Sequence, residues 1–200
     1  MEILFSDKDI AVCIKPVGLD SETEVPAALK NILGAEIFPL HRLDKNVGGV
    51  MVYARTKSAA ASLSKAIQNG QMRKEYVAKV HGAPPEGGVL TDLLFKDSRK
   101  NKVFVVKKLR SGVKEAKLQY RHLGEGLVHV RLFTGRSHQI RVQFSSRGFP
   151  LIGDHKYGSR AAETAPMLFS CRITFPYKGK TCQFNALPEW AKDITLEEWT

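Results

Sequence analysis

The chain has 200 residues, 43% of them hydrophobic, which suffices for one well-buried core and leaves no room for a second domain of ordinary size. Its net charge is +11, no apolar run reaches the roughly 20 residues that cross a bilayer, and charges interrupt the N-terminal stretch, so we expect a cytoplasmic protein without a membrane partner. Cys13, Cys171 and Cys182 are odd in number and lack the paired spacing of a zinc site, which favours buried thiols over a disulfide or a metal.

The first part of the chain alternates strands with helices. Thr56 is a good N-cap and Gly70 a good terminator for the amphipathic segment between them. The predicted elements are strands at 3–7 and 10–16, a helix at 24–33, a buried strand at 49–54 and a helix at 57–68.

The second part of the chain is mainly β. Gly124, Glu125 and Gly126 predict a hairpin turn between two strands. The predicted elements are strands at 74–82, 89–95, 103–108, 116–123 and 127–133, a helix at 136–148, a Gly-rich loop at 150–158, strands at 167–175 and 180–186, and a helical turn at 187–193. Consecutive strands indicate a largely antiparallel sheet, so the predicted class is α+β.

Positive charge is concentrated in the middle of the chain. Residues 41–182 carry 27 Lys or Arg and 9 Asp or Glu, a net charge of +18, whereas both ends are acidic. Residues 96–117 alone hold nine basic and two acidic side chains. This density suits a polyanion, because each cation that meets a phosphate releases condensed counterions. A solvated basic face without a partner is the alternative, and a membrane surface is disfavoured because the segment lacks an apolar face.

One acidic residue, Asp44, stands among His41, Arg42 and Lys45 just before the apolar run at 49–54. A lone Asp in such a place is usually a loop cap or a surface ion pair. The other interpretation is chemical, since a carboxylate can attack or stabilise an electron-poor sugar carbon. The neighbouring motifs favour the chemical interpretation.

Three segments resemble, in order, the signature segments of the RluA-type pseudouridine synthases: HRLDKNVGGVMVYART (41–56), GRSHQIRVQF (135–144) and GFPLIGDHKYG (148–158). KEYVAKVHG (74–82) resembles the tyrosine-bearing strand of that family, and residues 3–19 resemble the start of its catalytic domain. The resemblance implies one catalytic domain over residues 1–200 with the pseudouridine synthase fold, a bent, mostly antiparallel mixed sheet flanked by helices, and no separate RNA-binding domain.

The same resemblance implies an isomerase that uses neither a cofactor nor a metal. It would convert specific uridines in ribosomal or transfer RNA to pseudouridine, with RNA as its partner and a monomer as its expected state. Two other classes stay open: a binding protein that keeps the fold without catalysis, and a nucleoside hydrolase in which water completes the reaction.

Three residues match the catalytic positions of the family: Asp44, Tyr76 and Arg141. Asp44 would perform the bond chemistry, and Arg141 would pair with it. Tyr76 would place its ring against the uracil and help to remove the proton from carbon 5, although a phenol with a pKa near ~10 is a poor base. The plain interpretation of Tyr76 is a core tyrosine with its hydroxyl at the rim.

A second set is predicted to contact RNA: His41, Arg42, Lys107, Lys108, Arg110 and Arg136. Arg42 resembles the family arginine that fills the space left by an extruded base, and a simple phosphate contact is the alternative. His41 and His138 lack metal-ligand partners at suitable spacing and are interpreted as supporting hydrogen-bonding residues. Asp154 and Tyr157 are interpreted as parts of a tight loop that supports the cleft.

Two positions depart from the family pattern. Val47, Gly48 and Gly49 stand where the family usually has Thr-Ser-Gly, and Gln143 stands where His is common. The first departure bears on how the loop behind Asp44 is held, and it is the only feature that favours a binding protein without catalysis.

Overall fold

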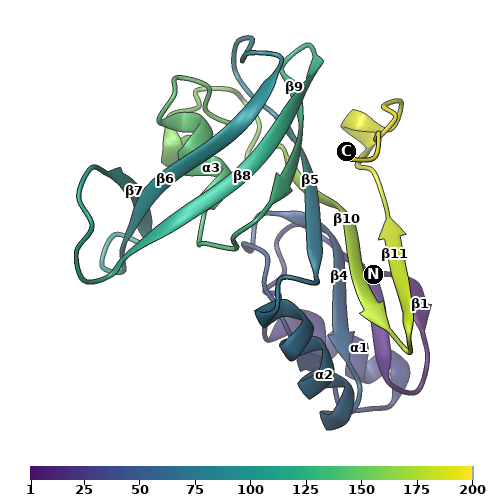
Figure 1. Ribbon diagram of the computed structural model, residues 1–200. Coiled ribbons are helices and arrows are strands. Elements are labelled where there is room, and N and C mark those ends of the chain that lie inside the picture. Colours follow the sequence, from purple (N-terminus) through teal and green to yellow (C-terminus); the bar gives the residue numbers. More distant parts are fainter. Residues whose placement is uncertain (200) are drawn as a thin grey trace.

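The structure is a computed structural model that describes residues 1–199 (Figure 1). The strands are β1 (Glu2–Ser6), β2 (Ile10–Lys15), β3 (Phe38–Pro39), β4 (Gly48–Ala54), β5 (Arg73–Lys79), β6 (Gly87–Asp97), β7 (Lys102–Val106), β8 (Val113–Gly124), β9 (Leu127–Leu132), β10 (Leu168–Tyr177) and β11 (Lys180–Asn185). The helices are α1 (Glu24–Leu33), α2 (Lys57–Gln68) and α3 (Gln139–Ser145), with 3-10 turns η1 (His155–Tyr157) and η2 (Glu189–Ala191).

The strands form a single mixed sheet in the order β1-β2-β4-β10-β5-β9-β8-β6-β7, with β3 paired to β4 and β11 to β10. Among the described residues, β4 and β10 make the one parallel pair. The predicted α+β class and mostly antiparallel mixed sheet are therefore confirmed.

The sheet divides along β10. Phe169 and Ser170 at its start pair with β4, whereas from Arg172 onward the same strand pairs with β11. The backbones of β4 and β10 approach closely at Gly49, where φ is +129° and a Cβ atom would lie 2.4 Å from the Ser170 backbone N and O. Glycine is required there. Figure 1 shows the result, with β6, β8 and β9 in one wing and β4, β10 and β11 in the other.

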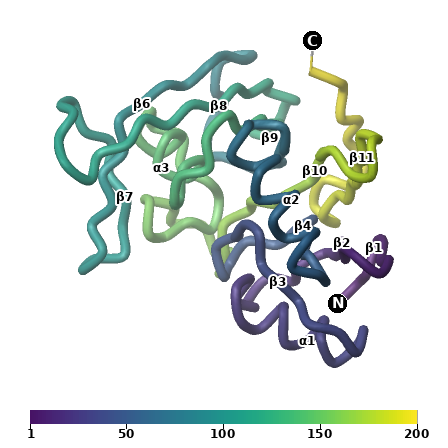
Figure 2. The backbone as a smooth tube through the Cα atoms, turned by 60° about the horizontal axis from the view of Figure 1, so that its bottom comes forward, coloured from purple at the N-terminus to yellow at the C-terminus, as the bar shows by residue number. Residues whose placement is uncertain are grey.

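Helices cover both faces of the sheet. Leu63 of α2 packs with Val50 and Val52, whereas Leu29 of α1 packs on the opposite face with Met51, because successive strand residues point to opposite sides. α3 shares the core that α1 joins, and Figures 1 and 2 place it beside the β6–β8 wing. The loop before β4 and the start of α3 therefore meet on one side of the sheet.

The predicted helix at 136–148 is too long at both ends, since α3 spans Gln139–Ser145. α3 begins at Gln139, because His138 adopts a left-handed conformation with φ 49°. The Gln139 side chain accepts hydrogen bonds from the Arg136 N–H (3.0 Å) and the Thr134 hydroxyl (2.8 Å), which fold the preceding residues into a turn. Local side-chain bonding of this kind competes with helix formation.

Most other local predictions are confirmed. The Thr56 hydroxyl accepts from the Ala59 N–H at 3.2 Å and caps α2, and the turn at 124–126 joins β8 to β9. The two-residue strand β3 was not predicted, and the last helical turn is the short 3-10 turn η2. All three cysteines are free thiols, two of them buried.

The segment after β11 covers the face of β5, β9 and β10 that lies opposite α3. Its apolar side chains pack with Val77 and Cys171, and Glu75 on this face is bonded to His129 at 2.9 Å and to Arg172 at 3.2 Å. Glu75, His129 and Arg172 are all buried. Among residues 1–199, no helix has the length and apolar character that crossing a bilayer requires.

Candidate active site

Asp44 lies in the loop between β3 and β4, and the peptide groups around it are anchored. The Ser21 hydroxyl donates to the Leu43 carbonyl (2.9 Å) and accepts from the Leu43 N–H (3.1 Å). The Val47 N–H donates to the Asp44 carbonyl at 2.9 Å. The Asp44 side chain is 23% exposed, so its carboxylate can be reached from the cleft.

The peptide that follows Asp44 is held by a buried lysine. Lys15 Nζ donates to the Lys45 carbonyl at 3.1 Å, and its other two hydrogens go to the carbonyls of Pro16 (2.9 Å) and Leu19 (2.7 Å). The Gly18 N–H also donates to the Lys45 carbonyl, at 2.8 Å. Burial lowers the pKa of Lys15 to about 8, against the pull of nearby carboxylates.

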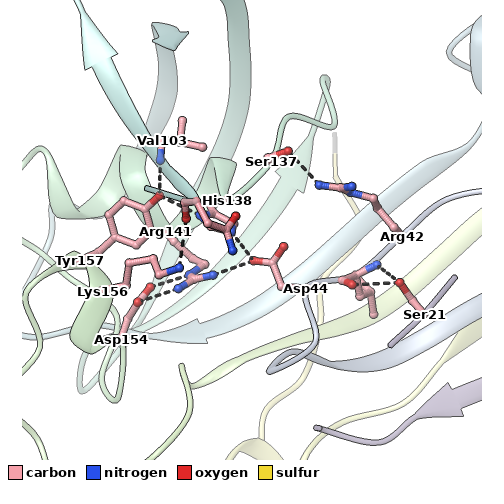
Figure 3. A network of polar contacts seen from close by, with 12 residues as sticks. Ser21, Arg42, Asp44, Val103, Ser137, His138, Arg141, Asp154, Lys156 and Tyr157 are labelled. Atoms are coloured by element: carbon pink, nitrogen blue, oxygen red, sulfur yellow. Dashed lines mark hydrogen bonds and ion pairs between the residues drawn. The ribbon is translucent and has the colours of Figure 1, made fainter. Parts of the chain in front are cut away.

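Arg141, on α3, links Asp44 to a second carboxylate, Asp154. Its Nη1 donates to Asp44 Oδ2 at 2.8 Å, while Nε and Nη2 donate to the two oxygens of Asp154 at 2.7 and 2.8 Å (Figure 3). Burial alone would lower the pKa of Arg141, but the hydrogen bonds to Asp154 and Asp44 raise it above its usual value. The guanidinium is therefore a fixed cation between two carboxylates.

His138 and Tyr157 form the wall next to this arginine. The Tyr157 hydroxyl accepts from the Val103 N–H at 2.8 Å and is hydrogen-bonded to His138 Nδ1 at 2.8 Å. The other ring nitrogen of His138, Nε2, lies 3.8 Å from Asp44 Oδ2. Burial lowers the pKa of His138 to about 4 despite the opposing charge of Asp44, which supports the neutral form.

Tyr76, on β5, lines the same cavity as Asp44. A cavity of about 60 Å³ is lined by Asp44, Tyr76, His138 and Arg141 among others. Burial and the charge of Asp44 raise the pKa of the Tyr76 phenol above its usual value, so the hydroxyl is neutral near pH 7.

Two larger hollows share Asp44 and Arg42 with this cavity. One, of about 420 Å³, extends toward the loop between β9 and α3, and the other, of about 370 Å³, extends toward η1. Arg42 Nη2 donates to the Ser137 hydroxyl at 3.0 Å across the opening (Figure 3), and its Nη1 lies 3.7 Å from Glu22. Residues 1–199 contain no group of three or more His, Cys, Asp or Glu side chains placed to hold a metal ion.

The residues predicted to contact RNA are placed differently. Arg136 lines the cavity beside Asp44 and donates to the Glu115 carbonyl at 2.8 Å. His41 Nε2 accepts weakly from the Val52 N–H at 3.4 Å. Burial and nearby Lys74 hold the pKa of His41 well below 6.5, so His41 adds no charge to the cleft.

Lys107, Lys108 and Arg110 are exposed in the connection between β7 and β8. None of the three lines the hollows that Asp44 shares, and Arg110 lies over the ring of Phe95 at 4.7 Å. They form a basic surface separate from the cleft.

Residues 9–146 match the family described as RNA pseudouridylate synthase. The chain belongs to this family. It is 34% identical over 203 residues to the dual-specificity RNA pseudouridine synthase RluA of Escherichia coli (strain K12), an alignment covering 92% of this chain and 91% of that protein. It is also 34% identical to ribosomal large subunit pseudouridine synthase D of Vibrio cholerae, where 80% of this chain spans only 54% of the relative.

The structural likeness agrees. Human RNA pseudouridylate synthase domain containing 4 superimposes with a TM-score of 0.77 at 26% identity, covering 94% of this chain and 89% of that one. The pseudouridine synthase fold implied by the sequence is therefore confirmed.

The structure accounts for both departures from the pattern of the RNA pseudouridylate synthases. Val47 is buried, and Gly49 allows the close approach of β4 to β10. Gln143 is buried on α3 and donates to Asp92 of β6 at 2.7 Å, and Arg147 binds the same carboxylate at 2.8 Å. Gln143 thus fastens α3 to the β6 wing and does not line the cavity beside Asp44.

Proposed function

We propose that this chain isomerises uridine to pseudouridine in RNA, with ribosomal or transfer RNA as the substrate. The observation that carries the proposal is the Asp44 carboxylate in the lining of a cleft, bound by an arginine whose Nε and Nη2 both bind Asp154. The names of the relatives support the substrate class, since one acts on the large ribosomal subunit and another has dual specificity.

The reaction breaks the bond between uracil N1 and the sugar C1′ and forms a bond from C5 to C1′, while C5 loses a proton and N1 gains one. Asp44 supplies the carboxylate that attacks or stabilises C1′. Arg141 fixes the orientation of that carboxylate, and His138 Nε2 lies 3.8 Å from the same oxygen.

Tyr76 packs the detached uracil and takes part in proton removal after the first bond has broken. The charge of Asp44 is, after burial, the largest cause that raises the Tyr76 pKa. Once the sugar is bonded to Asp44, this carboxylate is no longer an anion, so the pKa of Tyr76 falls and the phenolate, the form that can accept a proton, is easier to form at the step that needs it.

A target uridine must leave its stack before C1′ can reach Asp44. Arg42 binds Ser137 across the opening. In this proposal Arg42 breaks that hydrogen bond when RNA binds and fills the space that the extruded base leaves in the stack. In this proposal the chain acts as one catalytic domain and as a monomer, without a cofactor or a metal.

Release of tritium from RNA carrying 5-tritiated uridine tests the proposal, because isomerisation expels the hydrogen at C5. Wild type should release tritium in the presence of a chelator and without added nucleotide, and Asp44→Asn should not, because an amide is a poor nucleophile without charge. RNA affinity should be nearly equal for the two proteins.

The products separate the competing functions. A nucleoside hydrolase would yield free uracil without tritium in water, and a binding protein would yield neither. Comparing pseudouridine maps of total RNA from cells with and without the gene identifies the target position.

A further inference from the structure

The 420 Å³ hollow beside the Asp44 cavity is strongly basic. Five cations line it, Arg42, Arg73, Lys74, Arg131 and Arg136, and its single carboxylate is Asp44, which already binds Arg141. The mechanism proposed above uses Arg42 and leaves the other four cations without a role. Excess charge of this kind in a cleft attracts anions.

Lys74 is partly buried in this wall, as is Arg131, whereas Arg42, Arg73 and Arg136 are exposed. It is half-buried on β5, two residues before Tyr76, so both side chains point to the same face of the sheet. Burial is the one cause that lowers its pKa, and among the described residues no hydrogen bond or carboxylate acts on its ammonium. A Cβ atom on Gly135 would lie only 3.8 Å from Lys74 Nζ, so the ammonium borders the loop between β9 and α3.

Three of the four neighbouring arginines have partners, Arg131 by lying over the Phe133 ring at 5.3 Å, and the fourth, Arg73, is exposed, so Lys74 is the partly buried cation without a partner among the described residues. Arg42 binds Ser137, and Arg136 binds the Glu115 carbonyl. A desolvated ammonium without a partner costs free energy, and an anion delivered by a ligand removes that cost. The ordinary alternative is a lysine whose stem packs on apolar surface while its head reaches water.

The geometry points to an RNA phosphate as the anion. Positions two apart on a strand are separated by about 6.5 Å, so Lys74 lies roughly one nucleotide from the base that packs on Tyr76. We propose that Lys74, with Arg136, forms a phosphate-binding subsite for a phosphate that flanks the target uridine. This inference rests on the proposed function and adds a fixed point for the RNA backbone, separate from the bond chemistry at Asp44.

Binding measurements in an Asp44→Asn background test the subsite without turnover. The probes are total transfer RNA and a labelled hairpin with one uridine in its loop. Lys74→Met keeps the stem and removes the charge, so affinity should fall roughly tenfold and the slope of log affinity against log salt should shrink by about 0.7 to 0.9. Lys79→Met is the matched control, because Lys79 lies on the same strand, is also half-buried and faces the other side of the sheet.

Hairpins with an uncharged methylphosphonate on the 5′ or the 3′ side of the uridine identify the phosphate. At one of the two linkages, the methylphosphonate should weaken binding to the protein that keeps Lys74. At the same linkage it should cause no further loss of affinity in the Lys74→Met protein. Affinity and salt slope equal to those of Lys79→Met, or additive losses at both linkages, would overturn the subsite. If wild type releases tritium from RNA while either result holds, the proposed function stands and the subsite alone fails; if wild type neither binds nor isomerises RNA, both fail.

Discussion

Asp154 and Asp44 both bind Arg141, yet they differ in burial and in the number of hydrogen bonds they accept. Asp154 is 1% exposed and accepts two hydrogen bonds from the guanidinium, whereas Asp44 is 23% exposed and accepts one. We predict that Asp154→Asn destabilises the fold strongly and that Asp44→Asn stops turnover at little cost in stability.

The magnitudes follow from burial. Removing one member of a buried ion pair leaves an uncompensated charge and costs about 3 to 5 kcal/mol. For a chain of this length, each kcal/mol lowers the melting temperature by about 2 to 4 °C, so Asp154→Asn should lower it by about 6 to 20 °C. Asp44→Asn removes a partly solvated contact while Asp154 still holds Arg141, so its cost should be about 1 kcal/mol or less.

Urea unfolding followed by circular dichroism measures both costs, with m-values compared to confirm that the unfolded states are alike. Asp193→Asn is a suitable control, because Asp193 is exposed near the C-terminus. A loss below about 1 kcal/mol for Asp154→Asn, or a larger loss for Asp44→Asn than for Asp154→Asn, would refute the reasoning from burial.

Three further predictions concern other parts of the molecule. Tyr76→Phe keeps the ring and removes the hydroxyl, so single-turnover isomerisation should slow by about 10² to 10⁴-fold at unchanged RNA affinity, and near-equal rates would remove the hydroxyl from the mechanism. Replacing Lys107, Lys108 and Arg110 together by Ala should weaken RNA binding and lower its salt slope, whereas an unchanged slope would show that this surface faces solvent. Burial would raise the pKa of Glu75, but its neighbours His129 and Arg172 outweigh burial, and the pKa is lowered. Ionised Glu75 therefore stabilises the fold at pH values above its unfolded pKa. This stabilisation is lost as the pH falls through the lower pKa of the folded state. Glu75→Gln should therefore flatten the loss of stability in urea between about pH 5 and pH 3, and an identical acid slope in both proteins would contradict the shift.

The elements that were predictable from sequence are those with local signals. The α2 segment has a capping hydroxyl, an apolar face and a terminating glycine, and the strands around it alternate or run apolar. The start of α3 was not predictable in this way, because the side chain of Gln139 bonds back to Thr134 and Arg136 and unwinds three residues that helix periodicity alone would include.

Asp154 and Lys15 show why part of the candidate site could not be predicted. Asp154, like Asp44, is an acidic residue in the basic part of the chain. Its partner Arg141 lies on another element, however, and only folding brings the two side chains together. Lys15 ends an apolar strand, and nothing local shows that three carbonyls converge on its ammonium.

The anchoring of Asp44 bears on the substitution of Val47 for a family threonine. Before Asp44, the Ser21 hydroxyl binds both the N–H and the carbonyl of Leu43. After Asp44, the Lys15 ammonium binds the carbonyl of Lys45. Lys15 is fully buried, and its ammonium donates three hydrogen bonds to carbonyls. Moving this loop would break one of these bonds inside the protein, which costs free energy because a buried charge needs partners. The backbone of Asp44 is therefore held on both sides by residues outside the departing triplet. Val47 is buried, and its N–H donates to the Asp44 carbonyl. The position of the Asp44 carboxylate therefore does not depend on a side-chain hydroxyl at position 47.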